Sequence, residues 1–219
     1  MGTQFKIKEA NFFLRRLKQN SKSVRISAFY FSAFLSSTYS ILYHLLTEYN
    51  EKFELGLKNI KKENFEKRAN KQKNKDAIKF IKWYSDRLDI LWNDKTCGKL
   101  MRLRHDNTHK YFEIPRHYIL LSPTSKKVGI MGIEPTFGKT INDKKYNFMI
   151  NKATDRFRED VNDFLMEYNQ KPIKKITRKI VLLIPEIGHL DLESGCAKFL
   201  REVKKTVDEA YTNYPLFEK

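Results

Sequence analysis

Apolar side chains recur at three- and four-residue intervals over much of the chain, and this spacing predicts amphipathic helices. The pattern is present in five segments: residues 7–19, 26–47, 77–92, 157–168 and 196–211. Ser21 or Ser23 is placed to cap the second of these helices. Residues 58–76 contain almost no apolar side chains, so an exposed helix and a loop both stay open there.

The second segment is long and uncharged, which raises the question of a membrane span. Residues 26–47 carry no formal charge over 22 positions, about the length that crosses a bilayer. However, six serine and threonine residues between 27 and 40 make the segment more polar than a typical span. Its apolar face follows helical spacing: Ile26, Phe29, Tyr30, Ala33, Phe34, Ser37, Ile41 and Leu45. We therefore predict the central helix of a bundle.

The pattern changes between residues 111 and 152. Three short segments there are rich in β-forming residues and separated by turn residues: Arg116–Leu121, Lys127–Glu134 and Lys145–Ile150. Residues 176–184 fit a strand or a buried helix turn equally well. The fold class predicted is mainly α: a single domain over 1–219, a helical bundle with a small antiparallel β-rich insertion at 111–152 and closing helices in 153–219.

The charge of the chain indicates the kind of partner that the protein binds. The net charge is +17, and residues 1–110 hold 24 Lys/Arg against 11 Asp/Glu, a net of +13. Such a charge favours a polyanionic partner, either a nucleic acid or an anionic membrane surface. Cys97 and Cys196 have no CxxC neighbour, and the first residues lack the apolar core of a signal peptide. We expect a soluble, cytoplasmic protein with two buried or idle thiols.

The short stretch from Leu103 to Lys110 holds the most informative chemistry. If it is helical, Arg104 and Thr108 share a face, as do His105 and His109, and we expect Arg104 and His109 to lie on nearly the same side. A neutral imidazole can accept the proton of a ribose 2′-hydroxyl, and a guanidinium can bind the phosphate. Since the ribose supplies the nucleophile, RNA cleavage at such a site requires no metal.

The string Arg104-His105-Asp106-Asn107-Thr108-His109 resembles the Arg-polar-x-x-x-His motif of HEPN domains. The segments EANFFLRRL and FYFSAFLSSTYSIL look like the first two helices of bacterial HEPN proteins, so the resemblance covers roughly residues 8–110. It implies a helical bundle that forms homodimers, with the two motifs facing each other across the two-fold axis. Many HEPN proteins are metal-independent ribonucleases of toxin–antitoxin, abortive-infection and CRISPR systems.

The resemblance also implies roles for single residues. Arg104 would bind the scissile phosphate, His109 would be the general acid or base, and His105 would be the polar second position. Asn107 is a candidate for substrate contact. The predicted RNA-binding residues are Arg102, Lys110 and Tyr111, although core anchoring of Tyr111 is as good an interpretation. The expected partners are RNA, a second copy and an antitoxin or activator protein, with no cofactor and no membrane.

Other interpretations of the sequence stay open beside this one. His105 to His109 is also an H-D-x-x-H string, which could bind zinc with Asp106 as the base, although no third ligand has a recognisable spacing. Residues 132–140 nearly spell a P-loop but carry one residue too many between the glycines. His44 is expected to be a core or interface histidine. A non-catalytic, basic RNA-binding or structural HEPN protein is the alternative to a ribonuclease.

Overall fold

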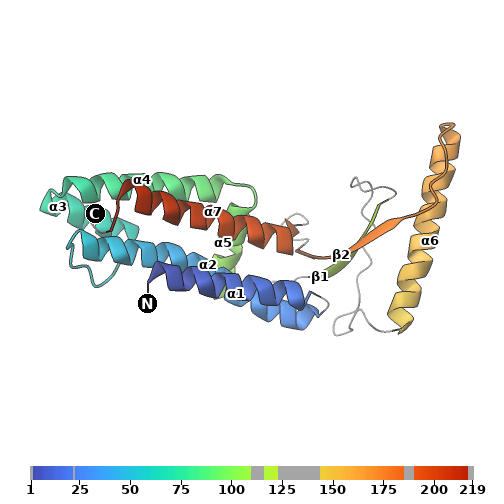
Figure 1. Ribbon diagram of the computed structural model, residues 1–219, viewed down its shortest axis with the longest axis horizontal. Coiled ribbons are helices and arrows are strands. Elements are labelled where there is room, and N and C mark those ends of the chain that lie inside the picture. The colour runs from blue at the N-terminus through green and yellow to red at the C-terminus, as the bar shows by residue number, and fades with distance from the viewer. Residues whose placement is uncertain (1, 22, 110–115, 123–143, 185–189, 217–219) are drawn as a thin grey trace. The chain divides into compact units, whose positions relative to one another are not determined.

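The computed structural model describes residues 2–21, 23–109, 116–122, 144–184 and 190–216 (Figure 1). The described helices are α1 (Thr3–Gln19), α2 (Val24–Lys52), α3 (Lys62–Gln72), α4 (Lys75–Asn93), α5 (Cys97–His109), α6 (Lys144–Glu167) and α7 (Leu192–Asn213). The strands are β1 (Arg116–Ser122), β2 (Thr177–Ile184) and β3 (Leu190–Asp191). Helices contain 78% of the described residues, which confirms the mainly α fold class. None of the described helices is long and apolar enough to cross a membrane.

The chain divides into two compact units, which are described separately. The first comprises residues 1–16, 29–113 and 194–219, and the second comprises residues 17–28 and 114–193. The first unit therefore holds most of α1 and α2 together with α3, α4, α5 and α7, and it contains the Arg104 motif. The single HEPN-like domain over 1–219 stays a prediction.

Helix α2 is the central element of the first unit. Its fully or nearly fully buried side chains point in several directions around the helix: Phe31, Phe34, Leu35, Ile41, Leu42, Leu45, Leu46 and Tyr49. The prediction of a helix contacted by neighbours on most sides is therefore confirmed. The apolar face predicted for it is wrong at its N-terminal end, where Ile26 and Phe29 are 43% and 67% exposed.

Aromatic packing joins α2, α4 and α7 at one end of the first unit. The ring of Tyr49 stacks on Phe80 with centroids 3.9 Å apart. The Tyr49 hydroxyl shares its proton between two carbonyl oxygens at the end of α7, those of Ala210 (2.8 Å) and Tyr214 (2.7 Å). Burial, with the neighbouring Tyr211 and Glu48, raises the pKa of Tyr49, so the hydroxyl remains a donor. The Tyr49 hydroxyl thus ties α2 to carbonyl oxygens at and just beyond the end of α7.

The sequence left residues 58–76 open between an exposed helix and a loop. In the structure, Lys62–Gln72 form the helix α3. Only Phe65 and Ala69 of α3 are buried, and the Phe65 ring lies 5.7 Å from that of Phe80. Lys73 ends the helix in the left-handed region at φ 52°, a conformation that normally favours glycine. Asn74 then caps α4 by accepting a hydrogen bond from the Ala77 amide at 3.0 Å.

The second unit contains a small antiparallel sheet in the order β1-β2-β3. Arg116 lies opposite Leu183 and Ser122 opposite Thr177, so the strand predicted over Arg116–Leu121 is confirmed and residues 177–184 are also a strand. The partner strand β2 lies outside the insertion predicted at 111–152. The segment Lys127–Glu134 lies outside the described residues.

The strand predicted over Lys145–Ile150 is wrong, because these residues begin α6. Their aromatic and branched side chains suit a strand, and Phe148 is 68% exposed in the helix. No glycine or proline interrupts residues 144–167, so the helix predicted from Phe157 onward extends back through this segment. Continuity with a longer helix outweighs local β-propensity, which is only a weak preference.

Candidate functional site

The helix that carries the motif begins at a well-defined cap. The Asp94 carboxylate accepts hydrogen bonds from the backbone amides of Thr96 (2.9 Å) and Cys97 (2.8 Å) through one oxygen. Thr96 directly precedes α5 and Cys97 is its first residue, and amides at this end of a helix have no partner within the helix. An aspartate also stabilises a helix N-terminus through its charge. Asp94 therefore fixes the residue at which α5 starts.

Gly98 allows the close approach of α5 to the end of α4. A Cβ atom built at this position would lie only 2.1 Å from the carbonyl oxygen of Trp92. No side chain fits at that separation, because the obstacle is backbone. Glycine is thus required in the first turn of α5, and it keeps the turn between α4 and α5 short.

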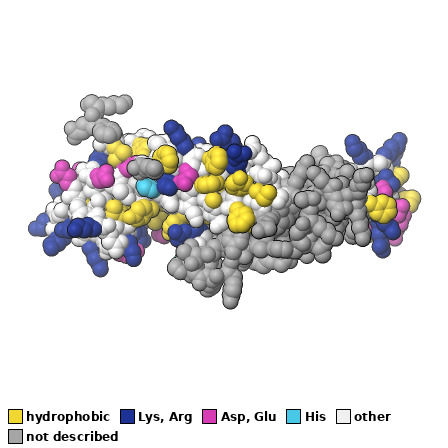
Figure 2. Space-filling view, turned by 90° about the horizontal axis from the view of Figure 1, so that it is seen from below, with side chains coloured by type: hydrophobic (Ala, Val, Ile, Leu, Met, Phe, Trp, Pro, Cys, Tyr) yellow, Lys and Arg dark blue, Asp and Glu magenta, His cyan; other side chains and the backbone are white. Residues whose placement is uncertain are grey.

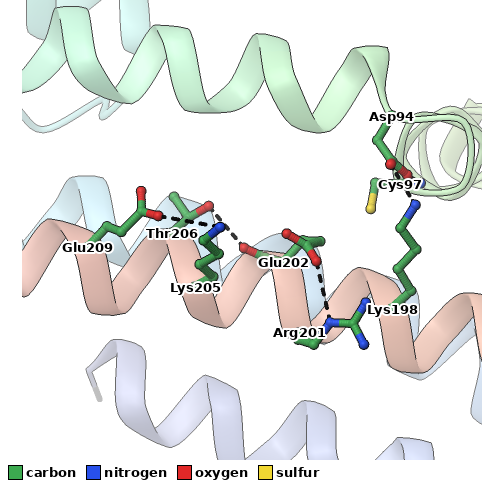
Figure 3. Close-up of polar contacts among 8 residues, drawn as sticks. All are labelled: Asp94, Cys97, Lys198, Arg201, Glu202, Lys205, Thr206 and Glu209. Carbon is green, nitrogen blue, oxygen red and sulfur yellow. Dashed lines mark hydrogen bonds and ion pairs between the residues drawn. The ribbon is translucent and has the colours of Figure 1, made fainter.

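The second oxygen of Asp94 joins α5 to α7 (Figure 3). The Lys198 ammonium donates to it at 2.6 Å. Partial burial raises the pKa of Asp94, but the hydrogen bonds from the Cys97 amide, Lys198 and the Thr96 amide outweigh this effect and hold the pKa well below its usual range. The hydrogen bond to Asp94 correspondingly raises the pKa of Lys198. Both groups are charged at neutral pH, and the pair positions α5 against α7.

Cys97, beside this pair, is not a nucleophile. Its side chain is fully buried, and burial together with the hydrogen bond and charge of Asp94 raises the pKa of the thiol to about 12. A thiol needs a lowered pKa to react near neutral pH. Cys196 is also buried and free, so the prediction of two buried thiols is confirmed.

Three buried side chains, Leu100, Met101 and Leu103, hold α5 in the core, and Arg104 follows them directly. The guanidinium carbon of Arg104 lies 4.4 Å from the ring centroid of Tyr39 in α2. This is a cation–π contact, which holds the planar group in one orientation. The sequence did not indicate a role for Tyr39, because this residue lies in a serine-rich stretch 65 positions before Arg104.

The helical geometry of the motif corrects one expectation. Helix α5 continues to His109, so Arg104 and Thr108 do share a face, as do His105 and His109. Arg104 and His109 are five residues apart, which places them about 7.5 Å apart along the axis and roughly 140° apart around it. The expectation that Arg104 and His109 lie on nearly the same side is therefore wrong.

The other predicted site residues are placed as follows. Arg102 and His105 are exposed on α5, and Asn107 lies within the same helix. The side chains of residues 106–109 are not described, and Lys110 and Tyr111 lie outside the described residues. Over the described part of the chain, no group of three or more His, Cys, Asp and Glu side chains could hold a metal ion. His44 is half-buried, and burial followed by the charge of Lys6 lowers its pKa.

Comparison with protein-family models, with curated proteins and with solved structures finds no match. The resemblance to HEPN domains consequently depends on the motif and on the two N-terminal helices alone. It stays a prediction, and the function below is argued from the residues.

Replacing Asp94 is expected to loosen the motif helix in a pH-dependent way. Asp94→Ala removes the cap and the ion pair, and we expect a loss of about 1–2 kcal/mol in the free energy of unfolding at pH 7. Because folding lowers the pKa of Asp94, its contribution is complete above about pH 4 and is lost as the pH falls further. The difference between wild type and variant should therefore narrow toward pH 3 in urea unfolding.

The matched control is Asp89→Ala, which replaces an exposed carboxylate near the end of α4. Its effect should stay within about 0.5 kcal/mol at both pH values. An Asp94→Ala difference that is the same at pH 7 and pH 3 would contradict the assignment of the stabilisation to the ionised carboxylate.

Proposed function

We propose that this protein is a metal-independent endoribonuclease of HEPN type. The observation that carries the proposal is the Arg104 guanidinium, held against Tyr39 on a capped helix that continues to His109. The strongly basic N-terminal half, with its net charge of +13, supports an RNA substrate. By analogy with HEPN proteins, the protein acts in the cytoplasm in stress or phage defence, as a toxin controlled by an antitoxin or activator protein.

The proposed reaction is an internal transfer on the RNA strand. His109 accepts the proton of the ribose 2′-hydroxyl as the 2′-oxygen attacks the adjacent phosphorus atom. The bond from phosphorus to the 5′-oxygen of the next nucleotide breaks, and that oxygen leaves with a proton from a general acid. The products are a 2′,3′-cyclic phosphate and a 5′-hydroxyl. Arg104 stabilises the charge that develops on the non-bridging phosphate oxygens.

The neighbouring residues of the motif have supporting roles in this proposal. His105 and Asn107 contact the substrate or hydrogen-bond within the motif. The exposed side chain of Arg102 binds a flanking phosphate. Lys110 and Tyr111 follow the motif directly and are proposed to bind RNA by charge and by base stacking.

The separation of Arg104 and His109 around α5 favours a site completed by a second copy. Within one chain the two residue positions lie roughly 140° apart around α5, which disfavours their acting together on one phosphate. In a homodimer, Arg104 of one copy can pair with the histidine of the other. The first unit also exposes large apolar side chains on α1 and α2 that a second copy could cover: Phe5, Phe12, Phe29 and Tyr43.

The alternative function is a non-catalytic RNA-binding or structural protein, in which the basic surface acts and the motif is residual. The observation that favours it is the charge of residues 58–82, which lie outside the motif and hold ten Lys/Arg against three Asp/Glu. This alternative predicts salt-sensitive RNA binding without cleavage products.

The catalytic assignment is tested by two single variants. Arg104→Ala and His109→Ala should each reduce RNA cleavage in EDTA by at least about 100-fold, since each removes a group that acts on the transition state. The measurement is the appearance of 2′,3′-cyclic phosphate ends on total RNA. His44→Gln and Arg15→Ala, which replace the same residue types elsewhere in the chain, should leave the rate unchanged.

Cleavage by Arg104→Ala at the wild-type rate would refute the assignment. If neither the wild type nor any variant cleaves RNA while all of them bind it, the alternative function is supported instead.

Tyr39 is expected to be a positioning residue for Arg104. Tyr39→Phe keeps the aromatic ring and should retain most of the cleavage rate, whereas Tyr39→Leu removes the cation–π contact and should lower kcat about 5- to 30-fold, the equivalent of 1–2 kcal/mol. KM should change little, because the substrate still meets the same charge. Equal losses in both variants would show that the ring face does not orient Arg104.

A mixture of two inactive variants tests whether the site is shared between copies. If Arg104 and His109 act across a dimer, mixed dimers of Arg104→Ala and His109→Ala contain one intact site, and roughly a quarter of the wild-type activity should return. If both residues act within one chain, every site in the mixture lacks a group and no activity returns. Each inactive variant alone, at the same total concentration, is the control.

A further inference from the structure

Residues 58–82 carry an unusual share of the charge of the chain. This stretch contains ten Lys/Arg and three Asp/Glu, a net of +7, out of +17 for all 219 residues. It forms α3 and the first part of α4, the helical pair whose cores meet at Phe65 and Phe80. Figure 2 shows Lys and Arg side chains gathered at the end of the first unit where these helices lie.

Helix α3 carries three of its four cations on a flank away from its acidic residues. Phe65 and Ala69 define the buried side of the helix. At 100° per residue, Lys67, Arg68 and Lys71 follow one another along one flank of the helix. The acidic residues of α3, Glu63 and Glu66, lie on the other flank, beside Asn70. This is an organised cationic surface and not a random mixture of charges.

The first half of α4 continues the same arrangement. Lys75, Lys79 and Lys82 recur at four- and three-residue spacing and are exposed on the side opposite the buried Ala77 and Phe80. The six cations of the two helices, Lys67, Arg68, Lys71, Lys75, Lys79 and Lys82, are called the basic platform below. Because both helices are anchored in the aromatic cluster, these cations sit on rigid elements.

The basic platform is barely neutralised by the protein itself. Among the described residues, the ion pair that involves a cation of the basic platform is that of Lys79 with Asp76, at 3.9 Å and with both side chains more than 70% exposed. Exposed pairs of this kind contribute little. The cations therefore repel one another, and an external anion would offset this repulsion.

The surroundings of the basic platform favour a nucleic acid over a membrane. Helices that bind an anionic bilayer insert large apolar side chains beside their cations. None of the large apolar side chains between residues 54 and 89 is exposed, and this whole stretch is described. What accompanies the cations is a series of amides, including Asn64 and Asn70, which hydrogen-bond to sugar and phosphate.

The same surface lacks the means to bind single-stranded bases. Proteins that bind single strands stack bases on exposed aromatic rings. In this stretch Phe65, Phe80 and Tyr84 are buried, and Trp83 is turned partly into the aromatic cluster beside Phe80. A surface of rigid cations without exposed rings suits the phosphate rows of a double helix, which are recognised by shape and charge.

We propose that the basic platform is a docking site for the backbone of double-helical RNA, separate from the Arg104 motif. The proposal names a structured RNA as the substrate class and to that extent rests on the proposed function. Tyr39, against which Arg104 lies, and Phe53, which contacts Phe65, are 14 residues apart along and just beyond α2. That separation corresponds to roughly 21 Å, so one folded RNA can reach both places.

The test compares two fourfold variants with the same net charge. The platform variant is Lys67→Gln, Lys71→Gln, Lys75→Gln and Lys82→Gln in one full-length chain. The matched control replaces four exposed cations of the second unit: Lys152→Gln, Arg156→Gln, Lys171→Gln and Lys174→Gln. Both reduce the charge from +17 to +13. His109→Ala is added to both and to the reference, so that binding is measured without cleavage.

The probes are a labelled RNA duplex of about 20 base pairs and an unstructured RNA strand of the same length, each titrated at several salt concentrations in EDTA. The platform variant should bind the duplex at least about tenfold more weakly than the reference, and the slope of log affinity against log salt should fall by roughly three to four. The control should differ from the reference by less than about twofold. The reference should bind the duplex more tightly than the single strand.

Three results would overturn the inference. Equal losses in the platform variant and the control would show that net charge alone binds RNA. Equal affinity of the reference for duplex and single strand would exclude a double-helix site. Loss of binding to phosphatidylserine vesicles, with duplex binding retained in the platform variant, would assign the surface to a membrane. Failure of the proposed function is read separately, as absence of cleavage by the protein with His109 intact.

Discussion

The packing of Tyr49 between α4 and α7 is the interaction on which the first unit depends. Its ring stacks on Phe80, which in turn contacts Phe65 of α3, while its hydroxyl donates to the last carbonyls of α7. One side chain of α2 thus contacts α4 by ring stacking and the end of α7 by hydrogen bonds, and it is linked to α3 through Phe80. Helix α3 buries only Phe65 and Ala69, so this aromatic cluster is what keeps its cations in a fixed place. Burying one phenylalanine contributes about 2–3 kcal/mol, enough to hold a short helix that a pattern of apolar residues would not predict.

The motif is positioned by a different set of contacts, at the start of α5. Asp94 determines where the helix begins, Lys198 ties that point to α7, and Gly98 lets the first turn pass close to Trp92. Arg104 then meets Tyr39 on α2. Since a helix is rigid over a few turns, a shift at its first residue would displace every later residue by the same amount. Two contacts therefore fix the position of Arg104. One is the ion pair at the start of α5, and the other is the aromatic ring that contacts the arginine itself.

Much of the helical framework could be predicted from the sequence, because apolar spacing reports directly on burial. All the predicted apolar positions of α7 from Cys196 to Ala210 are buried. The failures have two causes. Lys145–Ile150 looks like a strand in isolation but is helical because it continues into the longer helix α6. Tyr39 carries no local signal because its partner is 65 residues away. The Asp94 cap was not predicted, although an aspartate shortly before a helix is a known signal of a helix start.

The distribution of charge says more about function than its total. A chain that needed only solubility would mix its charges, since exposed ion pairs of opposite sign avoid repulsion at little cost. Here α3 contributes two buried side chains to the core and carries Lys67, Arg68 and Lys71 on one flank, with its two glutamates on the other. Cations placed together in this way repel one another, and a bound anion would offset that repulsion. In the proposed function, an anion site on rigid helices, with the motif on another helix of the same unit, would separate the binding of a substrate from the reaction on it. Binding energy gained at a distant site would then position the reacting phosphate without requiring tight binding at the motif itself.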